Sequence, residues 1–97
     1  MIGTTSEQRA ERMDADLNEL LTAIGEEVAT AESKWPPMNS AHEAYAVLLE
    51  EVDELWEHVK TNQKRRDLKA MRLEAVQVAA MAVRFVRDVC DEERGRK

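Results

Sequence analysis

The sequence predicts an all-α fold, in which long helices form a bundle that is completed by oligomerisation. Apolar residues recur every three or four positions over long stretches, which is the spacing of one face of an α-helix. The 97 residues include only 3 glycines and 2 prolines, which leaves little turn material for a fold of many short strands. Hydrophobic residues make up 43% of the chain, too many for a disordered protein. We expect one helical domain over residues 1–97, with residues 1–5 and 93–97 frayed.

The first helix is expected from about Ser6 to Ser33, with Ser6 as its N-cap. Its apolar stripe is formed by residues at helical spacing: Met13, Leu17, Leu20, Ile24, Val28 and Ala31. Two consecutive prolines, Pro36 and Pro37, end the helix, because proline has no backbone donor and disfavours helical geometry in the residue before it.

The second helix is expected from Ser40 to about Lys60, since Ser40 and Glu43 have the spacing of a capping box. The third helix is expected from about Asp67 to Glu92. Its middle, residues 75–83, is apolar on nearly every side and must be covered by more than one neighbour. We therefore expect a homodimer or a homotetramer.

Charge and composition exclude several classes of protein. The formal net charge of −6 disfavours nucleic-acid binding, because an acidic surface repels phosphate backbones. The single cysteine, Cys90, cannot form an internal disulfide, and we interpret it as a buried thiol. The longest apolar stretch is too short to span a bilayer, and the N-terminal residues have no apolar core like that of a signal peptide. These features predict a soluble, cytoplasmic protein without a membrane or nucleic-acid partner.

The acidic residues of the second helix do not all point toward solvent. A helix turns about 100° per residue, and four apolar side chains fall within about 60° of Glu51: Ala44, Val47, Leu48 and Leu55. Glu54 lies at the edge of this stripe, and Glu50 lies farther out. On the third helix, Glu74 lies in a similar apolar stripe, and Gln77 borders it.

A buried carboxylate must be protonated, paired or bound to a metal. Carboxylate oxygens are the ligands that Mg²⁺ prefers, and two neighbouring helices that each supply a pair of polar groups can form such a site. The structural alternatives are a solvated acidic face, or an ion pair of Glu51 with Arg72 or Lys69.

The segments LLEEVDEL (residues 48–55) and LEAVQVAAMAVRF (residues 73–85) resemble the MazG-like, all-α nucleoside triphosphate pyrophosphohydrolases. That family has E-E-x-x-E on one helix and E-x-x-D on the next, and the match covers about residues 35–89. The resemblance implies Mg²⁺-dependent hydrolysis of a nucleoside triphosphate, canonical or non-canonical and ribo or deoxy, to the monophosphate and pyrophosphate.

The same resemblance assigns roles to individual residues. It implies that Mg²⁺ is held by Glu51, Glu54, Glu74 and Gln77, and that Glu50 and Glu51 are catalytic. Gln77 stands where the family has Asp, and an amide supplies an oxygen but no charge. This departure favours the alternative of a non-catalytic helical module that binds nucleotide or another protein.

Five further residues are candidates for substrate binding: Trp35, His42, Lys60, Lys64 and Arg65. We interpret Trp35 either as a base-stacking residue or as a packing residue at the helix end. His42 opens the second helix and either contacts substrate or lies at the surface. The three basic residues either neutralise phosphate charge or form a solvated loop.

Overall fold

A computed structural model describes residues 5–91, which form three long α-helices and contain no strand. The helices are α1 (Ser6–Lys34), α2 (Ala41–Val59) and α3 (Leu68–Phe85). A short 3₁₀ helix, Gln63–Arg65, lies between α2 and α3, and a π-helical turn, Val86–Cys90, continues α3. The predicted all-α class is confirmed. The fraying expected at residues 1–4 and 93–97 and the predicted helix end at Glu92 lie outside the described residues.

The start of α1 differs from the prediction by one residue. Thr5 is the N-cap, because its hydroxyl accepts from the Gln8 N–H at 3.0 Å and the Gln8 side chain accepts from the Thr5 N–H at 3.0 Å. Ser6 has Arg9 three residues later, which cannot accept a hydrogen bond in return. Thr5, which we expected to be frayed, is therefore held by a capping box.

The other two helix starts follow the prediction closely. The Ser40 hydroxyl accepts from the Glu43 N–H at 3.1 Å, while the Glu43 carboxylate accepts from the Asn39 N–H at 3.2 Å rather than from Ser40. The Asp67 carboxylate caps α3 by accepting from two backbone N–H groups at 3.1 Å. Short polar side chains thus satisfy the first free donors of each helix.

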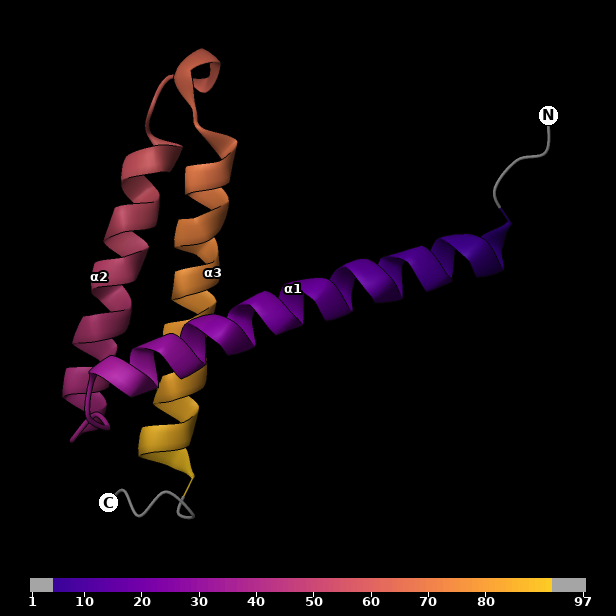
Figure 1. Ribbon diagram of the computed structural model, residues 1–97. Helices are drawn as coiled ribbons and strands as arrows, with labels where there is room; N and C mark the ends of the chain where they lie inside the picture. Colours follow the sequence, from indigo (N-terminus) through magenta and orange to yellow (C-terminus); the bar gives the residue numbers. More distant parts are fainter. Residues whose placement is uncertain (1–4, 92–97) are drawn as a thin grey trace.

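Helices α2 and α3 form a hairpin, and α1 crosses the lower part of α3 with its C-terminal half (Figure 1). The core lies at this crossing and is formed by Val28, Met38, Ala44, Ala80 and Met81. The N-terminal half of α1 extends away from the hairpin (Figure 1). None of the helices in the described part is both long and apolar enough to cross a bilayer.

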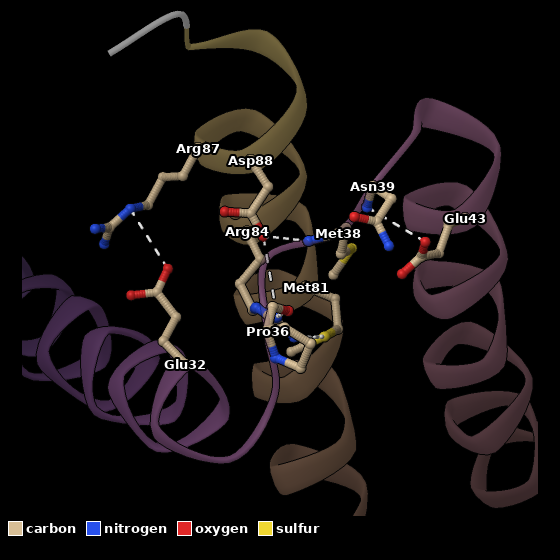
Figure 2. Close-up of polar contacts among 9 residues, drawn as sticks. All are labelled: Glu32, Pro36, Met38, Asn39, Glu43, Met81, Arg84, Arg87 and Asp88. Atoms are coloured by element: carbon tan, nitrogen blue, oxygen red, sulfur yellow. Dashed lines mark hydrogen bonds and ion pairs between the residues drawn. The ribbon is translucent and has the colours of Figure 1, made fainter. Parts of the chain in front are cut away.

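Two buried charged residues of α3 and its π-helical turn anchor the linker between α1 and α2 (Figure 2). The Asp88 carboxylate accepts from the Met38 N–H at 3.1 Å, and the Arg84 Nη2 donates to the Pro36 carbonyl at 3.1 Å.

Cys90 is exposed, contrary to the predicted buried thiol. It lies two residues from buried Asp88, which places it on the opposite side of the helical turn.

Candidate metal centre

Three carboxylates from two helices converge between α2 and α3. Glu51, Glu54 and Glu74 each offer one oxygen, and these oxygens lie within 4.8 Å of one another. Glu51 and Glu54 are three residues apart and therefore share one face of α2, which packs along α3. Glu51 and Glu74 are half-buried and Glu54 is exposed, so the cluster lies at the edge of the helix interface. Three hard oxygen ligands in this arrangement suit a divalent cation such as Mg²⁺.

Two acids of this cluster, Glu51 and Glu74, have a pKa above the ordinary carboxyl value. Burial, reinforced by the charge of Glu54 and a hydrogen bond with it, raises the pKa of Glu51 from 4.5 to about 7. Burial and the same neighbour also raise the pKa of Glu74, while His58 acts in the opposite direction. The carboxylates therefore repel one another, and a bound cation would relieve that repulsion.

Gln77 lies between two of the acids. In the amide orientation that satisfies both groups, its nitrogen donates to Glu51 Oε2 at 3.3 Å and to Glu74 Oε2 at 3.1 Å. The resemblance assigns the carbonyl oxygen of Gln77 to the metal, whereas here the nitrogen faces the carboxylates. Carboxylates accept and do not donate, so the nitrogen is the favourable atom when no cation lies between them. Rotating the amide by half a turn would present the oxygen instead.

A cavity of about 550 Å³ adjoins Glu51, whereas Glu54 and Glu74 do not line it; this volume is within the usual size range of a small-molecule site. It lies between the C-terminal part of α1, the linker, the first part of α2 and the middle of α3. Glu50, Glu51 and Gln77 form one part of its wall, and Trp35, which is 62% exposed, forms another. The structure thus brings the proposed catalytic acids and the aromatic candidate to the same cavity.

The other predicted substrate-binding residues lie outside this cavity. His42 is exposed in the first turn of α2 and does not line the wall. Lys60, Lys64 and Arg65 lie at the α2–α3 connection, at the far end of the hairpin (Figure 1). Lys60 forms an exposed ion pair with Glu57 at 3.0 Å. The structure therefore does not bring these four side chains together with the acids.

Two cationic residues that the sequence analysis did not select also line the cavity, Lys34 and Arg84. Arg84 lies seven residues after Gln77, a spacing that keeps both on one face of α3. That spacing is a sequence signal, but its meaning depends on the linker that folds over this face. Lys34 ends α1, and its position depends on how α1 crosses α3.

The alternative ion pairs of Glu51 are absent among the residues that the structure describes. Lys69 and Arg72 instead line a smaller cavity on the α1 side of α3.

Comparisons of the chain with protein-family models, with curated proteins and with solved structures found no match.

Proposed function

We propose that this protein is a Mg²⁺-dependent nucleoside triphosphate pyrophosphohydrolase that resembles the MazG-like enzymes. The observation that supports the proposal is the convergence of Glu51, Glu54 and Glu74, of which Glu51 also lines a cavity of about 550 Å³. Helical periodicity alone predicts that Glu51 and Glu74 lie in apolar stripes and that Glu54 lies at the edge of one, without reference to how the helices pack. Their meeting from separate helices is a specific requirement of the proposed metal site, and a solvated acidic face would not impose it.

The proposed reaction divides the work among these residues. Glu51, Glu54 and Glu74 would hold Mg²⁺, which when bound neutralises the charge that develops on the pyrophosphate leaving group. Glu50 is exposed, lines the cavity and neighbours Glu51, so it can orient a water molecule and accept its proton. The water oxygen attacks the α-phosphorus, the bond from this phosphorus to the bridging oxygen breaks, and pyrophosphate leaves. Trp35 offers an aromatic face for the base.

The test is release of pyrophosphate from a panel of ribo and deoxy nucleoside triphosphates, with and without Mg²⁺. We expect release by the wild type only with Mg²⁺ and none by Glu51→Gln. Asp53→Asn is the matched control, because Asp53 is exposed on the same helix and lies outside the acidic cluster. Metal-independent release, or equal loss in both variants, would contradict the proposal.

A non-catalytic nucleotide-binding or protein-interaction module is the second candidate. Gln77 favours it, because an amide that hydrogen-bonds two of the acids supplies no negative charge for a second cation. Under this alternative the wild type binds nucleotide, or a protein partner, and releases no pyrophosphate from any member of the panel. The same assay therefore separates the two functions.

We also propose that the active form is a homodimer or a homotetramer in the cytoplasm. The first half of α1 extends from the hairpin. Leu17 and Leu21, near the middle of this helix, are more than half exposed, at 51% and 54%. A second apolar surface, the α2 stripe, is formed by exposed residues spaced four, three and four apart: Tyr45, Leu49, Val52 and Trp56. Such spacing is typical of a helix face that packs against another helix.

A further inference from the structure

Arg84 is a buried cation with unused hydrogen-bonding capacity. Its side chain is 4% exposed, and its nearest carboxylate oxygen, Asp88 Oδ2, lies 3.9 Å from Nη2. Nη2 donates to the Pro36 carbonyl, and Nη1 has only the weak acceptor Met81 Sδ at 3.9 Å. Nε has no hydrogen-bond partner within the described part of the chain. A buried donor without an acceptor costs about 1–3 kcal/mol, so this arrangement calls for an additional acceptor.

The position of Arg84 indicates which part of a ligand could supply that acceptor. Arg84 and Gln77 line the same cavity and are about 10 Å apart along the α3 axis. A nucleotide whose phosphates lie at Glu51 and Gln77 can therefore reach Arg84 with its nucleoside end. The wall at this end includes Trp35, Pro36, Met38 and Met81, which suit a flat, largely apolar ring system.

We propose that Arg84 selects the base by donating hydrogen bonds to a carbonyl oxygen on its edge. The proposal rests on the proposed function, because it assumes that the cavity takes a nucleotide. Arginine is a donor only, so it suits bases that carry a carbonyl oxygen: guanine, cytosine, uracil and thymine. Adenine has no carbonyl group, and its acceptors N1 and N7 each lie beside the amino group, a donor that a guanidinium cannot pair with. Adenine nucleotides therefore accept fewer hydrogen bonds from the Arg84 guanidinium and are disfavoured.

The experiment measures calorimetric binding of GMP, CMP, UMP and AMP at saturating Mg²⁺. For the wild type we expect AMP to bind at least about fivefold more weakly than the tightest of the other three, since one good base-edge contact supplies about that much discrimination or more. Arg84→Met should remove the difference by weakening the carbonyl-bearing nucleotides and leaving AMP unchanged. Arg87→Met is the matched control, because Arg87 lies three residues away, pairs with Glu32 at 3.6 Å and is outside the cavity.

The outcomes separate this inference from the function on which it rests. If the wild type neither binds nor cleaves any nucleotide, the proposed function fails and the inference fails with it. If the wild type cleaves nucleotides but binds AMP as tightly as the others, only the inference fails, and no variant is needed to show it. If the order of the nucleotide affinities is the same in Arg84→Met as in the wild type, Arg84 only anchors the linker. Should Arg84→Met not fold, Arg84→Lys keeps the charge, loses the fork of donors and should narrow the same ranking.

Discussion

Glu51 is the residue at which burial and charge repulsion act together. Its pKa is raised to about 7 in the folded chain, above the ordinary value of 4.5. The stability that comes from protonated Glu51 is fully present below about pH 4.5 and is lost as the pH rises through about 7. Without metal, we expect the melting temperature to fall as the pH rises from about 4.5 to about 7. We expect the affinity for Mg²⁺ to rise over the same interval, because the cation competes with the proton.

Thermal melts across this pH range, with and without Mg²⁺, check the prediction. Glu51→Gln should flatten both pH profiles, because the amide neither titrates nor repels its neighbours. Asp53→Asn should keep the wild-type profiles. Equal pH dependence in the wild type and in Glu51→Gln would assign the titration to another group.

Gln77→Asp is the second prediction at this scale. The substitution removes two donors to Glu51 and Glu74 and adds a fourth carboxylate, so it should destabilise the metal-free protein by about 1–3 kcal/mol. It should also make the melting temperature rise more steeply with Mg²⁺, because a ligand of the folded state stabilises according to its affinity. Melts across a Mg²⁺ titration measure both effects. The control is Gln63→Asp, at an exposed glutamine in the 3₁₀ helix. If Mg²⁺ does not rescue the destabilisation of Gln77→Asp, the result argues against the metal site.

The acids could be selected from the sequence because helix geometry fixes which side chains share a face over one or two turns. The prediction of Glu51, Glu54 and Glu74 as a cluster required only that rule and the assumption that their helices pack together. Arg84 required more, since its environment is created by the linker, in which its partner Pro36 lies 48 residues earlier in the chain. The orientation of the Gln77 amide could not be predicted either, because it depends on the protonation and spacing of both acids.

At the scale of single elements, the helix starts were predictable to within a residue because capping is local. The linker between α1 and α2 was predictable only as a break at the prolines. Its path is set by the hydrogen bonds of Arg84 and Asp88 with Pro36 and Met38. No spacing rule connects residues so far apart in the chain.

Asp88→Ala tests this anchoring. The change removes the acceptor of the Met38 N–H and the carboxylate nearest to Arg84, so we expect a loss of about 3 kcal/mol in the free energy of unfolding. Urea denaturation measures the loss. Asp53→Ala, at an exposed position of α2, should change the free energy by less than about 0.5 kcal/mol. A similar small effect of Asp88→Ala would mean that the linker is held without Asp88, by the hydrogen bond from Arg84 to Pro36 and by apolar contacts.

At the scale of the whole molecule, the chain is elongated. Its radius of gyration is 17.0 Å, whereas a compact chain of this length has about 12.5 Å. Periodicity predicted three helices and their apolar faces, but it did not predict the angle at which α1 crosses the hairpin. That angle leaves apolar surface uncovered on α1 and on the α2 stripe.

A shared interface at these surfaces predicts that Trp56→Glu, in the α2 stripe, shifts the protein from an oligomer to a monomer. Placing a charge in a helix interface costs several kcal/mol, which suffices to dissociate micromolar complexes. Light scattering at micromolar concentration gives the mass of each variant. Leu68→Glu is the matched control, because Leu68 is 67% exposed at the start of α3, outside the stripe, and should leave the mass unchanged. A monomeric wild type would overturn the expectation.

The unsupported half of α1 also has a consequence for amide hydrogen exchange. This helix has 29 residues and is about 43 Å long, yet its packing against α3 is confined to the C-terminal half. Backbone amides near Leu17 should therefore exchange far faster in the Trp56→Glu monomer than those near Val28, because local opening there exposes little additional apolar surface. In the oligomer the two regions should be protected alike. The gradient of exchange along this single helix would then report subunit association, residue by residue.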